Sequence, residues 1–164
     1  MNKLQAMSSS HTRGLFGIDD RVSKVKSLLN MKSQDVLIVG IWGMGGIGKT
    51  MIAQVVCKKV RSRFEGILVE NLRQQSDLQR SFILSQLLGQ EINTMGSLSF
   101  QDTFVRDRLR RKKVFIVLDD VDDLIRLEEW RDLLDGRNSS FGPGSKVLIT
   151  SRDKQVLRNV VDET

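Results

Sequence analysis

A glycine-rich stretch, GIWGMGGIGKT at residues 40–50, constrains the fold of this chain more than any other part of its sequence. Five of its eleven residues are glycine, and glycine loses more conformational freedom on folding than any other residue. Gly43, Gly48, Lys49 and Thr50 match the spacing G-x-x-x-x-G-K-[ST] of a phosphate-binding loop. The stretch lies between an apolar, β-branched run and a segment of helical periodicity, which is the strand–loop–helix context that this loop requires.

The composition of the loop suits the binding of a polyphosphate. Backbone N–H groups converge on phosphate oxygens only where the chain curls tightly, and a Cβ would block the required dihedrals or the close approach. A helix that begins directly after the loop adds free N–H groups and its positive dipole end. Lys49 is expected to contact the β- and γ-phosphates, and the Thr50 hydroxyl to ligate Mg²⁺. The predicted nucleotide contacts are Gly43, Gly45, Gly46, Ile47, Gly48, Lys49, Thr50 and Met51.

Two acidic residues end a second apolar run, VFIVLDD at residues 114–120. Asp119 would lie at the carboxyl end of a buried strand, where ligands of open α/β sheets collect, and we expect it to hold Mg²⁺ through water. Asp120 could orient a hydrolytic water, although a turn or cap residue explains it equally well. Asp120 is one candidate catalytic residue, and Lys49 of the loop is the other.

A third strand, KVLIT at residues 146–150, is followed by Arg152. An arginine at this edge of the sheet could touch a γ-phosphate and so sense its presence. The alternative is that residues 151–157 simply begin a helix, with Asp153 near its cap.

Strands and helices alternate along the chain, which predicts right-handed βαβ units and an α/β fold with a parallel sheet flanked by helices. Asp19 or Asp20 is expected to cap the first helix, and Met51 to lie on the apolar face of the helix after the loop. Strands are expected at 36–42, 66–70, 114–120 and 146–150, and helices at 18–30, after residue 50, and at 76–90, 101–113, 123–134 and 151–157.

Composition excludes several classes of protein. One histidine and one cysteine are too few for an ordinary zinc cluster, and a lone cysteine fits a reducing compartment. No apolar run reaches the roughly 18 residues of a membrane helix, and the N-terminus lacks a signal core, so we expect a cytoplasmic or nucleocytoplasmic protein without a membrane partner. The net charge of +6 is concentrated at residues 106–113, with six bases and one acid. We interpret that run as a solvated helix face and expect no nucleic-acid partner.

The base of the nucleotide is expected to be adenine, because the N-K-x-D guanine reader is absent from the sequence. Phe16 and Trp42 are candidates for stacking on a base. Trp42 ends an apolar strand, however, and we expect it to be buried in the core.

Three motifs together resemble the nucleotide-binding (NB-ARC) domain of plant disease-resistance receptors, which apoptotic ATPases share. They are the glycine-rich stretch, VFIVLDDVDD at residues 114–123 and GPGSKVLITSRDKQVL at residues 142–157. The resemblance extends from about Gly14 to the C-terminus. Asp122, and FEGILVENLRQ at residues 64–74, are similar to the subclass that carries an N-terminal Toll/interleukin-receptor-like domain.

The resemblance implies a three-layer P-loop NTPase fold and a switch in immune signalling. Such a switch binds ADP at rest and ATP when active, hydrolyses ATP slowly at most, and associates with other copies or receptor domains. It also implies adenine contacts by the backbone of Phe16 and Gly17, γ-phosphate sensing by Arg152, a Mg²⁺ ligand in Asp119, and a catalytic acid in Asp120.

The sequence also departs from the family pattern. Met51 replaces a second threonine that would touch the α-phosphate, so only its backbone N–H is available there. We expect residues 1–12 to form a disordered tail, and residues 13–164 a partial domain without the last family strand, the helical subdomain or the winged-helix subdomain. That strand would lie beside the loop-bearing strand, whose outer edge is therefore expected to be unpaired.

Two other functions remain open. One is a small P-loop kinase or genuine ATPase with substrate turnover, and the other is an interaction fragment that binds no nucleotide. A kinase needs an acceptor site and an arginine-rich lid. Only residues 106–113 could supply that lid, and they precede the strand of Asp119 instead of following it.

Overall fold

A four-stranded parallel sheet forms the centre of the computed structural model, which describes residues 11–44, 48–73, 86–88, 105–122, 124–158 and 160–161. The strand order is β1-β4-β3-β2, and each neighbouring pair is parallel. Among the described residues β1 pairs with β4 alone. The strands are β1 (Leu37–Trp42), β2 (Gly66–Asn71), β3 (Val114–Asp119) and β4 (Lys146–Ser151).

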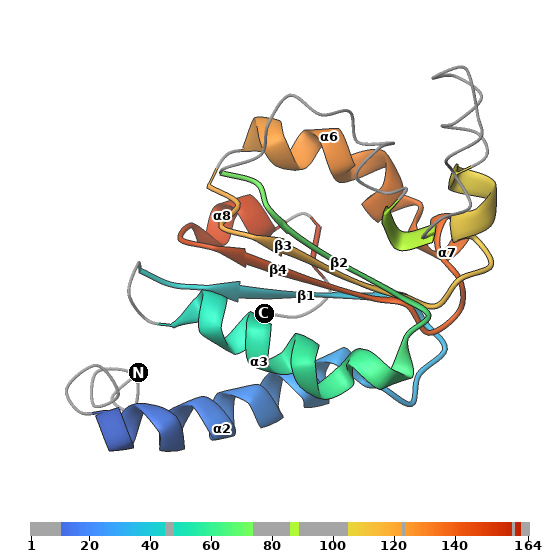
Figure 1. The fold of residues 1–164 in the computed structure, drawn as a ribbon. Coiled ribbons are helices and arrows are strands. Elements are labelled where there is room, and N and C mark those ends of the chain that lie inside the picture. Colours follow the sequence, from blue (N-terminus) through green and yellow to red (C-terminus); the bar gives the residue numbers. More distant parts are fainter. Residues whose placement is uncertain are drawn as a thin grey trace.

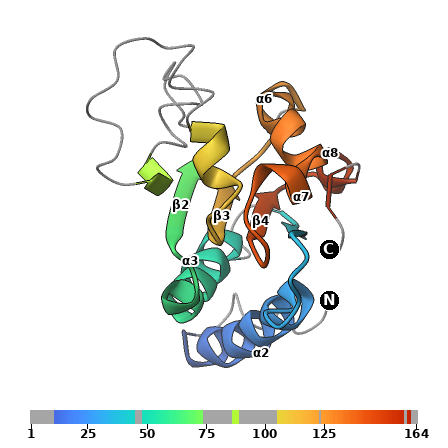
Figure 2. The same cartoon turned by 90° about the vertical axis from the view of Figure 1, so that its right-hand side faces the viewer.

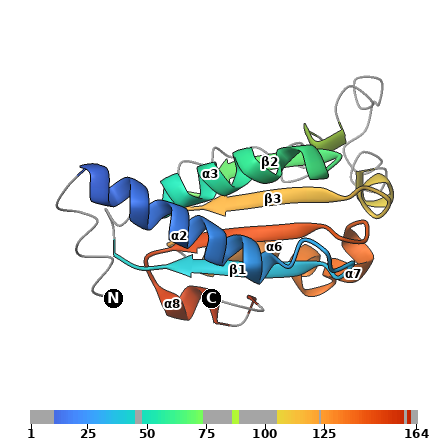
Figure 3. The ribbon, with the colours of Figure 1, turned by 90° about the horizontal axis from the view of Figure 1, so that it is seen from below.

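Helices cover both faces of this sheet, which confirms the predicted three-layer α/β fold (Figures 1 and 2). Helix α2 (His11–Leu29) and helix α3 (Lys49–Val60) lie along one face (Figure 3). A 3₁₀ turn, η1 (Arg61–Arg63), follows α3. The opposite face carries α6 (Leu124–Asp135), α7 (Arg137–Ser140) and α8 (Lys154–Leu157).

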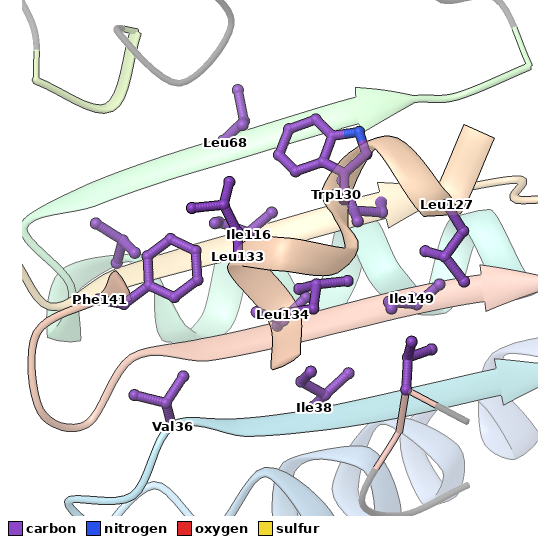
Figure 4. Close-up of a cluster of buried hydrophobic side chains, with 14 of the residues drawn as sticks. Val36, Ile38, Leu68, Ile116, Leu127, Trp130, Leu133, Leu134, Phe141 and Ile149 are labelled. Carbon is purple, nitrogen blue, oxygen red and sulfur yellow. The ribbon is translucent and has the colours of Figure 1, made fainter. Parts of the chain in front are cut away.

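The core divides into two apolar layers because successive strand residues point to opposite faces of the sheet. In β3, Phe115 and Val117 pack with the cluster under α2 and α3, whereas Ile116 and Leu118 pack with the cluster under α6. Trp130 of α6 is the largest fully buried side chain (Figure 4). All six residues of β3 and all six of β4 are buried. Burial on both faces explains why these strands are continuous apolar runs in the sequence.

Two of the predictions about the helices are wrong: the cap of the first helix and the position of Met51. Helix α2 begins at His11, so Asp19 and Asp20 lie inside the helix and do not cap it. Met51 is 51% exposed, because the buried face of α3 runs through other residues. Those residues are Lys49, Ile52, Ala53, Val56, Cys57 and Val60.

Several predicted segments lie wholly or partly outside the described residues. Of the predicted helix at 76–90, the structure describes only a 3₁₀ turn at residues 86–88. Within the predicted helix at 101–113, residues 105–109 are helical. The predicted tail lies outside except for residues 11 and 12, which belong to α2. None of the described helices is long and apolar enough to cross a membrane.

Candidate functional site

The glycine-rich loop joins β1 to α3 at the carboxyl edge of the sheet (Figure 1). Its first residue is tied to β4, because the Gly43 N–H donates to the carbonyl of Ser151 at 3.2 Å. At its other end Gly48 caps α3 with φ 82° and ψ 21°, in the left-handed region that only glycine enters without strain. Gly45, Gly46 and Ile47 lie outside the described residues.

Lys49, the first residue of α3, is buried and folds back over the beginning of the loop. Its Nζ donates to the carbonyl oxygens of Gly43 at 2.6 Å and Met44 at 2.9 Å. Burial, and then the positive charge of Arg152, lower the pKa of Lys49, while Asp120, Asp122 and Asp119 act in the opposite direction. The ammonium thus lies within electrostatic reach of Arg152 and of those three carboxylates.

Thr50 and Asp119 meet across the gap between α3 and β3. The Thr50 hydroxyl lies 3.0 Å and 3.2 Å from the two carboxylate oxygens of Asp119, which is buried. Hydroxyl and carboxylate oxygens are hard donors of the kind that Mg²⁺ prefers. Residues 69 positions apart in the sequence therefore form a donor pair that fits this ion. Both predicted metal ligands belong to this pair.

Thr150 of β4 holds the two aspartates, and the sequence analysis missed it. Its hydroxyl donates to Asp119 and accepts a hydrogen bond from the Asp120 N–H at 2.9 Å. Asp120 adopts φ 57°, which is uncommon for a residue with a side chain. Its carboxylate lies 3.5 Å from Arg73, whereas that of Asp119 contacts Thr50. A hydroxyl residue near the carboxyl end of β4 was the available signal, but its partners depend on strand order.

Arg73 is the second residue that the sequence analysis missed. It lies just after β2, with one guanidinium nitrogen 3.5 Å from Asp120 and another 3.0 Å from Asp122. Two acids at the start of the β3–α6 connection are therefore paired with a cation from the neighbouring connection. No motif in the sequence predicts this contact.

Arg152 follows β4 directly and is exposed, on the same sheet edge as the loop. Asp153 caps α8 by accepting the Gln155 N–H at 2.8 Å. The structure thus shows the helix with Asp153 at its cap. Contact between Arg152 and a γ-phosphate stays a prediction.

Trp42 corrects one prediction, because it is 44% exposed and not buried in the core. It is the last residue of β1, an outer strand among the described residues, and Lys154 Nζ lies 4.9 Å from its ring centroid. Phe16 and Gly17 belong to α2; the Phe16 side chain lies outside the described part of the chain. Inside a helix the backbone N–H and C=O groups bond to one another, so backbone contacts to adenine at these two residues require the helix to open there. The adenine contacts stay a prediction.

The parallel sheet, the glycine-rich loop between β1 and α3, and the Thr50–Asp119 pair together define a P-loop NTPase fold. A structural relative agrees with this fold: the crystal structure of Cdc6p from Pyrobaculum aerophilum matches with a TM-score of 0.62 at 16% identity. The match covers 88% of this chain and 41% of that chain.

Sequence comparison identifies the family. The NB-ARC domain model matches residues 18–164, and the chain belongs to the NB-ARC family. Disease resistance protein RPV1 of Vitis rotundifolia is 43% identical over 150 residues, which are 87% of this chain and 10% of that protein. TMV resistance protein N of Nicotiana glutinosa is 36% identical over 167 residues, 95% of this chain and 14% of that protein. The chain thus spans a small part of the length of these relatives.

Proposed function

We propose that this chain is an adenine-nucleotide switch module of a plant immune receptor, of the Toll/interleukin-receptor-like subclass. It binds ADP in the resting state and ATP in the active state. The observation that carries the proposal is the position of Lys49 over the loop beside the Thr50–Asp119 pair. The names of the two plant relatives, both resistance proteins, support a role in defence.

The residues of the site divide the work of binding. Backbone N–H groups of the loop and the first turn of α3 hold the phosphates, and Lys49 supplies the cation. Thr50 and Asp119 hold Mg²⁺, which neutralises phosphate charge when bound. Arg152 reaches the γ-phosphate, and Asp120 orients water during slow hydrolysis. Phe16 and Gly17 contact adenine. Its binding partners are the nucleotide, other receptor domains and further copies of the chain. It acts in the cytoplasm or nucleus.

The identity of any nucleotide that the protein retains tests this proposal. Protein purified without added nucleotide is denatured, and the released small molecules are separated by anion-exchange chromatography against ADP, ATP, GDP and GTP standards. We expect ADP in near-stoichiometric amount. Guanine nucleotides, or protein that neither retains nor rebinds an adenine nucleotide, would contradict the proposal.

The alternative to a switch is an enzyme with substrate turnover. The site is compatible with it, because Asp120 lies next to the proposed Mg²⁺ donor pair. Measuring phosphate release separates the two functions. A switch releases about one phosphate per bound ATP before it stops, whereas a kinase or ATPase continues through many cycles.

A further inference from the structure

Arg73 pairs with two of the acidic side chains that the structure describes at the carboxyl end of β3. Its guanidinium lies 3.5 Å from an Asp120 oxygen and 3.0 Å from an Asp122 oxygen. These carboxylates are more buried than the arginine, with side-chain exposures of 22% and 27% against 50%. The ion pairs therefore join a half-exposed cation to two carboxylates that are less exposed.

The backbone of Arg73 is fixed independently of its side chain. The Arg73 N–H donates to the Asn71 side chain at 3.0 Å, and the Leu72 N–H extends the β2–β3 pairing by donating to the Asp119 carbonyl at 3.0 Å. The segment that carries the guanidinium is thus anchored to the strand that carries Asp119. Because this backbone is already ordered, the ion pairs cost only the rotamer entropy of the side chain.

Burial has the largest effect on the pKa of Lys49 and lowers it, whereas Asp120, Asp122 and Asp119 each raise it, so all three lie within electrostatic range of its ammonium. Mg²⁺ compensates Asp119 when bound, but Asp120 and Asp122 have no such ion. A triphosphate held by Lys49 would feel their negative charge, and partial burial of the two carboxylates limits screening by salt.

We infer that Arg73 is a positioning residue that raises the affinity for ATP by pairing with Asp120 and Asp122, without itself touching the nucleotide. The inference rests on the proposed function. Because ATP carries more negative charge than ADP and extends further along the site, the effect is expected to be larger for ATP.

A charge-suppression experiment tests this inference. The affinities of Mg-ATP and Mg-ADP are measured by calorimetry for the unmodified chain, Arg73→Ala, Asp122→Asn and the double variant. Arg73→Ala should weaken ATP about fivefold and ADP about twofold, from the size of exposed charge interactions. Asp122→Asn in the Arg73→Ala background should recover most of the lost ATP affinity, and Arg73→Lys should retain most of it.

Arg131→Ala is the matched control. Arg131 is 42% exposed and pairs with two acids, Glu128 and Asp135, but on α6. Its replacement should leave both affinities unchanged, and circular dichroism should show intact folding in every variant.

Two results would overturn the inference alone. One is an Arg73→Ala variant that binds ATP as tightly as the unmodified chain. The other is a loss that persists undiminished with Asp122→Asn, since direct contact between Arg73 and the phosphates would produce it. An unmodified chain that binds neither nucleotide would overturn the proposed function as well.

Discussion

The ammonium of Lys49 lies 2.6 Å from the carbonyl oxygen of Gly43, six residues earlier in the chain. The first glycine of the motif and its lysine are thus in direct contact. A bound phosphate would compete with two backbone carbonyls for the same ammonium. Exchange of these neutral acceptors for charged oxygens gives stronger hydrogen bonds.

Asp119→Asn should remove most of the dependence of ATP binding on Mg²⁺. The substitution keeps the shape of the side chain but removes the charge beside Thr50. We expect at least about tenfold weaker Mg²⁺ affinity, in line with losses at metal sites generally. Calorimetric titration of ATP with and without Mg²⁺ measures the dependence of ATP affinity on the ion. Asp135→Asn on α6 is the control. Equal dependence on Mg²⁺ in Asp119→Asn and the unmodified chain would refute the metal role.

Arg152→Ala should weaken the binding of ATP about tenfold and that of ADP no more than about twofold, since a charge-assisted hydrogen bond to a γ-phosphate exists only with ATP. Competition with a fluorescent nucleotide measures both affinities. Arg158→Ala, an exposed arginine just past α8, is the control. A similar loss for the two nucleotides would argue against γ-phosphate sensing.

Gly48→Ala should destabilise the nucleotide-free protein by about 1–2 kcal/mol, because the residue has φ 82° and a Cβ is strained there. A Cβ at this position would meet no heavy atom within 4 Å, so no steric clash adds to the backbone strain. Urea unfolding measures it. Gly48→Asn should lose less, since asparagine tolerates the left-handed region better. Equal stability of all three proteins would show that the strain is absent.

Lys146→Met should change how stability depends on pH. Lys146 is fully buried and donates to the carbonyls of Ser33 and Asp35. Burial, and then the charge of Lys113, lower its pKa from the ordinary 10.5. The folded protein therefore loses this proton at a lower pH than the unfolded chain does.

The sign of this effect follows from proton linkage. Between the lowered pKa and 10.5, the unfolded state binds more protons, so stability rises with pH. The free energy of unfolding of the unmodified protein, measured in urea and taken relative to Lys146→Met, should increase as pH rises through this window. A difference that is constant or falls with pH would contradict the assignment.

Much of the fold could be predicted from local sequence patterns. The four strands are apolar runs between turn signals, and burial on both faces of β3 and β4 makes those runs continuous. The weakest prediction, β2, is also correct. The prediction that Trp42 is buried was wrong. Its exposure depends on the position of β1 in the sheet, which the sequence of β1 does not specify.

The site was predictable only where one motif or one strand end carries it. Lys49, Thr50 and Asp119 fall in recognisable patterns, whereas Thr150 and Arg73 act through partners on other strands. Those contacts exist because β4 and β2 flank β3, and strand order is a property of the whole sheet. The prediction that Met51 lies on the buried face of α3 was wrong for a related reason. Which face of α3 is buried depends on how the helix lies on the sheet.

The most direct test of the central claim is calorimetric titration of ADP into nucleotide-free protein, compared with the Lys49→Ala variant. The claim is that the loop at residues 43–50 holds the phosphates and that Lys49 supplies their cation. We predict one binding site per chain, with affinity reduced at least about 100-fold in Lys49→Ala while circular dichroism shows an unchanged fold. Equal affinity in the two proteins would contradict the claim.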